Sequence, residues 1–364
     1  MSAPRAELMR SILQRIATGP ELSKDISREE AREGMRLVLD QGVDPVQAGV
    51  FLIALRMKRE TDEENLGLLE AIREATLSAA APVDEVLDLG DPYDGYNRTL
   101  PASPFLPAVL AACGVATVSH GVERMGPKYG VTHRQVLAAA GLPVDLAPEQ
   151  AARRLGDARV GWAYVDQKAF APKLYALSPL RALIVKRPAI TTIEVLAGPV
   201  RGAKRTHLAT GFVHKPYPRI YAMLARHAGF DSALIVRGTE GGVIPSLSQT
   251  GKVFRYTEGG EEAPVEFKPA EFGIEQSLRA PRIPGAGEDE AQAPFDAASV
   301  ARAAADAGLA ALGGEPGATR DALVCGAAVC LWHLGRHRTL REAADAARAV
   351  LDEGAALARL HQAK

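Results

Sequence analysis

Apolar positions recur with a helical period over the first eighty residues of the chain. They form a broad apolar surface between residues 46 and 57 and a stripe at helical spacing between residues 66 and 77. Capping boxes mark three helix starts, at Ser27, Asp44 and Thr61, each followed three residues later by Glu or Gln. The pattern predicts an antiparallel helical bundle over residues 1–80. The surplus apolar surface of its third helix is also suited to a dimer interface.

From residue 83 onward, short apolar runs alternate with helical segments. Four runs are predicted to be strands: Val86–Leu89, Val115–Val118, Leu208–Val213 and Ala233–Val236. A helical segment lies between the members of each pair, and this strand–helix–strand order is typical of a parallel sheet. The sequence therefore predicts an α/β protein in which a small helical bundle domain joins a larger α/β domain with a central, mainly parallel sheet.

Prolines interrupt the stretch from residue 167 to residue 199, at positions 172, 179, 188 and 199. We expect this irregular, mostly helical stretch to pack on the bundle. The predicted bundle domain therefore comprises residues 1–80 with residues 166–200 added. The predicted α/β domain comprises residues 83–165 and 201–364.

Composition narrows the class of protein. The net charge is −1 over 364 residues, which is far from the bulk basicity of a typical nucleic-acid module. Net charge does not describe how charges are distributed, so it does not exclude a local basic groove. The three cysteines have no metal-type spacing. The N-terminal stretch lacks the apolar segment of a signal peptide, and no apolar run approaches membrane-spanning length, so we expect a cytoplasmic protein.

Charged and polar side chains gather in the loops that follow the predicted strands. In parallel sheets, ligands bind beyond the carboxyl ends of the strands, so these loops are expected to converge on one cleft. A cluster of Arg, Lys and His at loop tips suits a phosphate or carboxylate, although solvation is the favoured explanation for any single one of them. His214 and Lys215 are stronger candidates because they precede a predicted helix start, where partial positive charge favours an anion. The candidate phosphate-binding residues are Asp94, Gly95, Asn97, Arg98, His120, Gly121, Arg124, Lys128, His214, Lys215 and Arg237.

Two residues are candidates for a catalytic role. His120 follows a predicted strand and is either a contact to a phosphate or ribose hydroxyl, or a structural hydrogen-bonding residue. Glu240, in the Gly-rich turn RGTEGG, is either a general base or ribose contact, or a turn residue. No serine triad, cysteine nucleophile or metal-ligand cluster stands out in the sequence.

Several motifs resemble the anthranilate phosphoribosyltransferase family (glycosyl transferase family 3). Residues Glu29–Thr61 resemble the family's N-terminal bundle, and Val118–Gly141 resemble its second phosphate loop. EVLAGP (Glu194–Pro199) and ALIVRGTEGG (Ala233–Gly242) fall where the family has N-L-L-G-P and H-G-E-D-G. The resemblance implies the fold shared by phosphoribosyltransferases of this type and nucleoside phosphorylases, a ligand between the two domains, and a homodimer formed through the helical domain.

This sequence departs from the family pattern at the positions that bind phosphate and magnesium. The family's first loop reads G-T-G-G-D-G, whereas here Asp91, Pro92 and Tyr93 follow Gly90, and a proline offers no N–H to a phosphate. The second loop keeps His120, Gly121, Arg124, Lys128 and Gly130 but not the family's Asn and serines. Val243 and Ile244 stand where the family has the acidic pair that holds magnesium, and aliphatic side chains cannot ligate a hard cation. No cofactor is predicted, and magnesium is not expected at the family site.

These features favour a divergent glycosyl or phosphoribosyl transferase that binds a phosphate-bearing ligand, such as a nucleotide or a ribosyl phosphate. A branch of the family with a Y-D-G or Y-N-G first loop includes proteins regarded as nucleic-acid binders without transferase activity. A non-catalytic nucleic-acid-binding protein with a basic groove is therefore the alternative hypothesis. An authentic anthranilate phosphoribosyltransferase of tryptophan biosynthesis ranks last, because the magnesium pair is missing.

Overall fold

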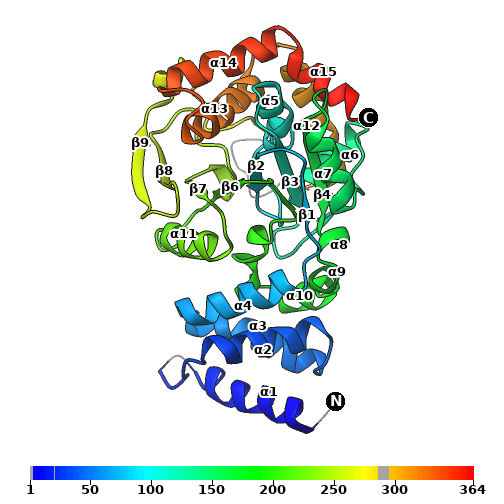
Figure 1. Cartoon of the computed structure of the whole chain (residues 1–364), viewed down its shortest axis with the longest axis vertical. Helices are drawn as coiled ribbons and strands as arrows, with labels where there is room; N and C mark the ends of the chain where they lie inside the picture. Colours follow the sequence, from blue (N-terminus) through cyan, green and yellow to red (C-terminus); the bar gives the residue numbers. More distant parts are fainter. Residues whose placement is uncertain (1–2, 20, 286–294) are drawn as a thin grey trace.

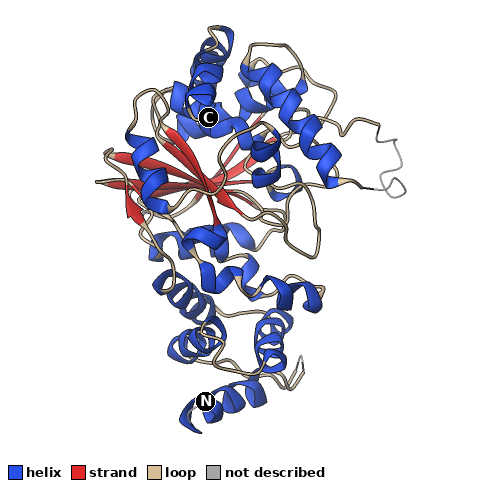
Figure 2. Ribbon diagram, turned by 90° about the vertical axis from the view of Figure 1, so that its right-hand side faces the viewer, coloured by secondary structure: helices blue, strands red, loops and turns tan. Residues whose placement is uncertain are grey.

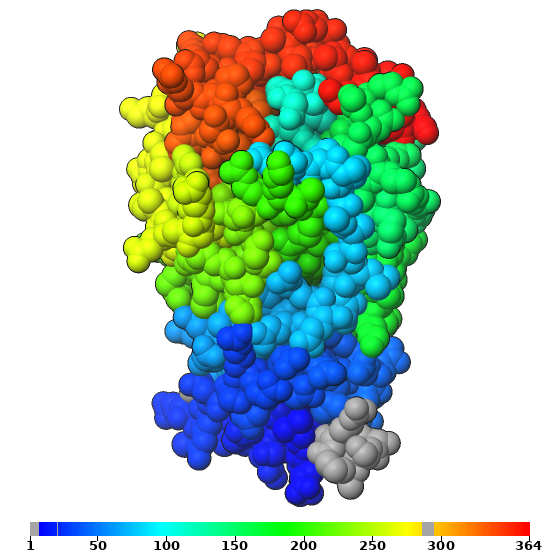
Figure 3. All heavy atoms as spheres, viewed as in Figure 1, coloured from blue at the N-terminus to red at the C-terminus, as the bar shows by residue number. Residues whose placement is uncertain are grey.

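The computed structural model describes residues 3–19, 21–285 and 295–364. A helical bundle forms one end of an elongated molecule, and a larger α/β body forms the other (Figure 1, Figure 3). The predicted fold class is confirmed. Among the described helices, none is long and apolar enough to cross a membrane.

Four helices build the N-terminal bundle: α1 (Ala3–Ile16), α2 (Arg28–Leu39), α3 (Pro45–Lys58) and α4 (Asp62–Glu74). Complete capping boxes start α2 at Ser27 and α4 at Thr61, and the Asp44 side chain caps α3 by accepting from the Val46 N–H. Each such cap satisfies N–H groups that have no partner inside the helix and stabilises it by about 1 kcal/mol. The local sequence therefore fixes where these helices begin.

Seven strands form one sheet in the order β4-β3-β2-β6-β7-β8-β9. The first five strands in that order are parallel, and β8 and β9 continue the sheet antiparallel at one edge. The strands are β2 (Glu85–Gly90), β3 (Thr117–Gly121), β4 (Trp162–Asp166), β6 (Arg205–Gly211), β7 (Ser232–Val236), β8 (Gly251–Tyr256) and β9 (Ala263–Phe267). Gly90 of β2 pairs with Thr210 of β6, so the carboxyl ends of these two strands lie side by side.

Helices cover both faces of the sheet (Figure 2). Successive residues of a strand point to opposite faces, so Val86 packs in one apolar cluster and Leu87 in another. The Leu87 face packs against α5 (Leu106–Ala112), α6 (His133–Ala139), α12 (Ala297–Leu312), α13 (Ala318–His333), α14 (Leu340–Asp352) and α15 (Ala355–Gln362). The Val86 face packs against α7 (Pro148–Gly156) and α11 (Tyr217–His227). Burial on both faces explains why apolar residues occupy successive positions in a strand such as β7, whose sequence is SALIV.

An irregular insert follows β4 and lies between the sheet and the bundle (Figure 1). It comprises α8 (Gln167–Phe170), α9 (Pro172–Tyr175), α10 (Ser178–Ile184) and the short 3-10 turns η2 (Ala189–Thr191) and η3 (Glu194–Leu196). Both α10 and η2 contact α3. Two short strands lead from this region toward the sheet, β1 (Ala79–Ala80) after the bundle and β5 (Val200–Arg201) after the insert, and they pair with each other. The division of the chain into domains at the residues given above stays a prediction.

Candidate functional site

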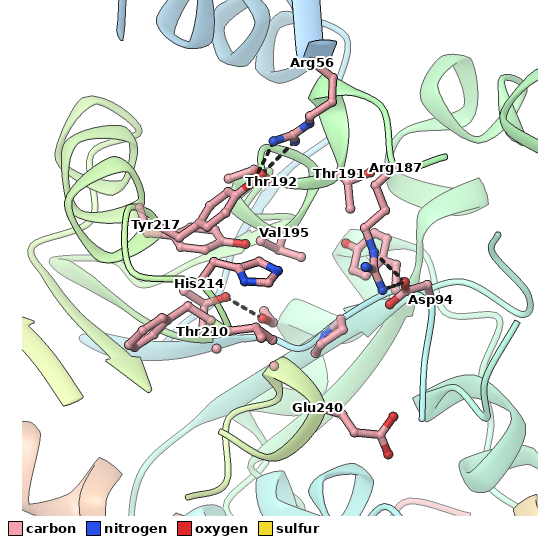
Figure 4. A pocket seen from close by; sticks show the side chains of 18 residues that line it. Arg56, Asp94, Arg187, Thr191, Thr192, Val195, Thr210, His214, Tyr217 and Glu240 are labelled. Atoms are coloured by element: carbon pink, nitrogen blue, oxygen red, sulfur yellow. Dashed lines mark hydrogen bonds and ion pairs between the residues drawn. The ribbon is translucent and has the colours of Figure 1, made fainter. Parts of the chain in front are cut away.

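A cavity of about 230 Å³ lies beyond the carboxyl ends of β2 and β6, between the sheet and the bundle (Figure 4). Its walls come from α3, the loop after β2, the insert, the loop from β6 into α11, and the turn η4 (Thr239–Gly241). The polar side chains that line it are Arg56, Asp94, Arg187, Thr191, Thr192, Thr210, His214 and Glu240. The larger apolar and aromatic ones are Tyr93, Val195, Phe212, Val213, Tyr217 and Tyr221.

Arg56 is the bundle's contribution to the cavity wall. Its Nη1 donates to the Tyr217 hydroxyl at 2.6 Å and its Nη2 to Thr192 Oγ1 at 3.2 Å and to the Pro188 carbonyl at 3.3 Å. The Glu60 carboxylate lies 3.2 Å from its Nε. Arg56 therefore joins the bundle, the insert and α11, and its two terminal nitrogens are engaged by the protein itself.

Arg187 and Asp94 form an ion pair on the cavity wall (Figure 4). Arg187 Nε and Nη2 lie 2.9 and 2.5 Å from the same oxygen, Asp94 Oδ2. The pair joins the insert to the loop after β2. Neither Arg56 nor Arg187 was predicted as a site residue, because no local motif surrounds them and their partners are distant in sequence.

The loop after β2 is held by its own buried carboxylate. Asp91, 2% exposed, accepts from Tyr96 Oη at 2.7 Å, His133 Nε2 at 2.8 Å, Ser103 Oγ at 2.9 Å and the Val243 N–H at 2.9 Å. Burial by itself raises the pKa of the Asp91 carboxyl, but His133 and the hydrogen-bond donors outweigh burial, so the pKa lies below its usual range. The Asp91 carboxylate thus occupies these four donors, which are then not free to bind an anion.

His120 is enclosed in the protein, which favours the structural alternative over the predicted ligand contact. The imidazole has no exposed surface. Its Nδ1 lies 2.5 Å from the Tyr93 hydroxyl and its Nε2 lies 2.7 Å from Asp88 Oδ1. Both ring nitrogens are engaged inside the protein, and His120 does not line the cavity.

Glu240 lines the cavity on the side away from Arg56 (Figure 4), but its carboxylate is already occupied. It accepts from the backbone N–H groups of Asn97, Arg98 and Thr99 at 2.8–3.2 Å, and it pairs with Lys128 Nζ at 2.5 Å. Burial raises the pKa of the Glu240 carboxyl, but Lys128 and these donors have the larger opposite effect and lower it. A general base works best with a pKa near the operating pH, so the lowered pKa argues against this role, which stays a prediction. Glu240 instead anchors the segment at residues 97–99.

The structure brings only some of the predicted phosphate-binding residues to the cavity. Asp94 and His214 line it, and Lys128 lies one contact away, between Glu240 and the Gly95 carbonyl. Gly95 has φ +72°, and a side chain there would come within 2.5 Å of the Val131 carbonyl, so its requirement for glycine is structural. The convergence predicted for all the loop residues is therefore wrong in that form.

The other predicted residues lie on the surface or in the core. Arg124 is exposed and its guanidinium lies 4.8 Å from the Tyr129 ring centroid. Arg237 is exposed, and its N–H donates to the Lys252 carbonyl of the neighbouring antiparallel strand. Gly121 is buried next to Tyr164. Asn97, Arg98 and Lys215 are exposed beside residues that line or anchor the cavity.

The position at which the family holds magnesium offers no ligands here. The Val243 side chain is buried and Ile244 packs near Gly326. The nearest carboxylate, Asp91, has its oxygens engaged by four donors. These residues do not fit a magnesium ion. Within the described part of the chain, no group of three His, Cys, Asp or Glu side chains is arranged to hold a metal.

Comparison with known proteins adds two family matches. The model of the helical bundle domain of a glycosyl transferase family matches residues 10–76, and the model of the a/b domain of a glycosyl transferase family matches residues 94–357. The protein named anthranilate phosphoribosyltransferase of Rhodopseudomonas palustris is 30% identical over 351 residues, which cover 96% of each chain.

Solved structures agree with this fold over the whole length. Anthranilate phosphoribosyltransferase from Thermus thermophilus superposes with a TM-score of 0.72 at 21% identity, covering 98% of this chain and 97% of that one. The enzyme from Saccharomyces cerevisiae in complex with PRPP and Mg gives a TM-score of 0.75 at 16% identity, covering 98% and 96%.

Proposed function

The chain belongs to the glycosyl transferase family whose helical bundle and a/b domain models it matches, and we propose that it is a divergent phosphoribosyltransferase-like protein that binds a phosphate-bearing ligand in the cavity between sheet and bundle. The proposed ligand is a nucleotide or a ribosyl phosphate. One structural neighbour is described as bound to PRPP and Mg, and a relative of similar length carries the name anthranilate phosphoribosyltransferase.

The observation that carries the proposal is the presence of two arginines and a histidine on the cavity wall. Arg56 and Arg187 line the cavity, and His214 lies between Thr210 and Tyr217 (Figure 4). His214 also precedes α11, whose N-terminal end carries a partial positive charge that favours an anion. In a ribosyl transfer, the bond from the sugar carbon to a phosphate or pyrophosphate breaks and an acceptor bonds to that carbon. Fixed positive groups of this kind would stabilise the departing anion.

We further propose that the ligand binds without magnesium at the family's position, because Val243, Ile244 and the engaged Asp91 supply no free ligand there. For the same reason, transfer to anthranilate ranks last among the candidate activities. Growth of a tryptophan auxotroph that carries this chain would contradict that ranking.

The binding proposal predicts heat in calorimetric titrations of the full chain with PRPP, AMP or inorganic pyrophosphate at low salt. His214→Ala is expected to weaken the binding by about tenfold, because a hydrogen bond to a charged phosphate contributes on the order of 1.5 kcal/mol. The matched control is His361→Ala, which removes an exposed histidine from α15 outside the cavity lining. Absence of binding for all three compounds, or equal weakening by the control, would contradict the proposal. Added Mg²⁺ is expected to change the affinity little.

Exposed cations beside the cavity support nucleic-acid binding as a second candidate. Arg98, Lys186 and Lys215 are exposed and adjoin Asn97, Arg187 and His214, and the last two of these line the cavity. A phosphate backbone bound there would release counterions, so the logarithm of the affinity for a single-stranded oligonucleotide would fall linearly with the logarithm of salt concentration. Such a dependence, together with no binding of the three small compounds, would favour this candidate over the transferase.

A face of the bundle supports the proposal of a homodimer. On α3, Val46 and Met57 are each 72% exposed, and Leu183 on the contacting helix α10 is 81% exposed. Clustered apolar side chains of this exposure are typical of protein interfaces. We expect light scattering to give twice the chain mass of 38.6 kDa.

The variant Val46→Glu/Met57→Glu is expected to shift this mass to that of the single chain, because two buried carboxylates would face the partner. Leu22→Glu, at an exposed leucine outside both helices, is the matched control and is expected to leave the mass unchanged. A wild-type chain that is monomeric at all concentrations would reject the interface.

A further inference from the structure

The Arg187–Asp94 ion pair sits on the wall of the cavity in an unequal environment. The Arg187 side chain is 52% exposed, whereas the Asp94 side chain is 8% exposed. The arginine therefore reaches from the insert toward a carboxylate that the loop after β2 holds in place. The Asp94 carbonyl also accepts from the Gly130 N–H, which fixes the backbone of that loop.

The geometry of the pair leaves part of the guanidinium unused. Nε and Nη2 both contact Asp94 Oδ2, and no hydrogen bond from Nη1 is found among the described residues. A guanidinium presents parallel donors that match two oxygens of a phosphate or carboxylate. A bidentate anion can therefore satisfy Arg187 at least as well as the single oxygen of Asp94 does.

The other cations near the cavity are differently committed. Arg56 donates to the Tyr217 hydroxyl, to Thr192 and to backbone carbonyls, and Lys128 is held between Glu240 and the Gly95 carbonyl. Freeing either cation would break several contacts between separate parts of the chain. Arg187 would give up a single carboxylate oxygen, so it is the cation that can change its partner at the least cost.

We propose that Arg187 binds the anionic group of the ligand and that Asp94 is an internal competitor, which holds Arg187 in the free protein and is displaced when the ligand binds. This inference rests on the proposed function, because it names the residue that recognises the ligand's phosphate or carboxylate. It reverses the role predicted for Asp94 from its place in the first loop. Asp94 opposes anion binding, because an anion must bind Arg187 more favourably than the Asp94 carboxylate does in order to displace it.

The test is titration of inorganic pyrophosphate and PRPP into the full-length wild type and three variants. Asp94→Asn is expected to tighten binding by roughly threefold to tenfold, since it removes a carboxylate from a partly exposed ion pair. Arg187→Ala is expected to weaken binding by about tenfold or more, as loss of a charged contact does. In the double variant Asp94→Asn/Arg187→Ala, the gain is expected to vanish, because Asp94 acts through Arg187.

The matched control is Asp62→Asn. Asp62 forms an exposed ion pair with Arg219, near the start of α11, and does not line the cavity. The Asp62→Asn substitution makes the same change in net charge as Asp94→Asn, and we expect it to change binding by no more than about twofold. Thermal unfolding of each variant checks that the fold is kept.

The outcomes separate the inference from the proposed function. If the wild type binds but Asp94→Asn binds equally or more weakly, Asp94 is a ligand contact or a bystander and the inference fails, while the proposed function stands. A gain that persists without Arg187, or that Asp62→Asn reproduces, also overturns the inference. If no variant binds either compound, the proposed function fails and the inference fails with it.

Discussion

Replacing Asp91 by alanine is expected to lower the free energy of unfolding by about 3–5 kcal/mol, because it removes the charged acceptor from a buried network. Four donors, from Tyr96, Ser103, His133 and the Val243 backbone, would lose their partner within the core. Since whole domains are stable by only about 5–15 kcal/mol, the loss is a large fraction of the total. Urea unfolding followed by circular dichroism measures it.

The variant Asp91→Asn keeps the shape of the side chain but removes its charge. Comparing it with Asp91→Ala separates the contribution of the charge from that of packing. The pKa of the Asp91 carboxyl is lowered in the folded chain. Its ionised form therefore adds stability above the unfolded-state pKa of about 4, and this stability is lost as the pH falls through the lower folded-state pKa. The difference between wild type and Asp91→Asn should thus be largest near pH 7 and shrink below about pH 4. Near-equal stability of the two proteins at pH 7 would show that the charge contributes little.

The second large effect is expected at the buried pair of Arg181 and Glu194. The two side chains are each 1% exposed, and the guanidinium contacts both carboxylate oxygens, at 2.6 and 2.7 Å. Gln167 adds a hydrogen bond to the same carboxylate at 3.2 Å. Arg181→Ala leaves the Glu194 charge buried and unpaired, so we expect a loss of about 3–5 kcal/mol in the free energy of unfolding.

Removing both charges is expected to be far less costly. Replacing a buried ion pair by apolar residues of similar volume is often neutral, so Arg181→Met/Glu194→Met should recover most of the loss. The matched control, Lys204→Ala, breaks an exposed pair with Asp84 and should change stability by no more than about 1 kcal/mol. A double variant as unstable as Arg181→Ala would mean that packing, and not charge, accounts for the cost.

The fold could be predicted because its determinants are local. The Ser27 and Thr61 capping boxes fix helix starts within four residues, and strands buried on both faces give apolar runs such as Val86–Leu89. The resemblance to the anthranilate phosphoribosyltransferase family, drawn from short motifs, is confirmed by the family models and by a 30% identical relative.

The site was predicted only in part, because its residues are paired over long distances. Asp94, His214 and Glu240 line the cavity as strand-end positions predict. Sequence order could not reveal that His120 would be enclosed by Asp88 and Tyr93, or that Glu240 would bind Lys128 and the backbone near residue 98. Arg56 was missed because the Pro188 and Tyr217 groups that it contacts lie 132 and 161 positions away.

The ion pairs between α4 and α11 are sensitive to ionic strength. Asp62 pairs with Arg219, and Glu70 accepts from Arg28 and lies 3.0 Å from His227, all near the surface. Dissolved ions screen such pairs, whereas the ribbon of β1 and β5 is held by backbone hydrogen bonds that salt does not weaken in this way. Concentrated salt should therefore loosen these surface pairs and leave the bundle seated on the sheet, because one buried apolar cluster runs from the bundle through the insert to Val86.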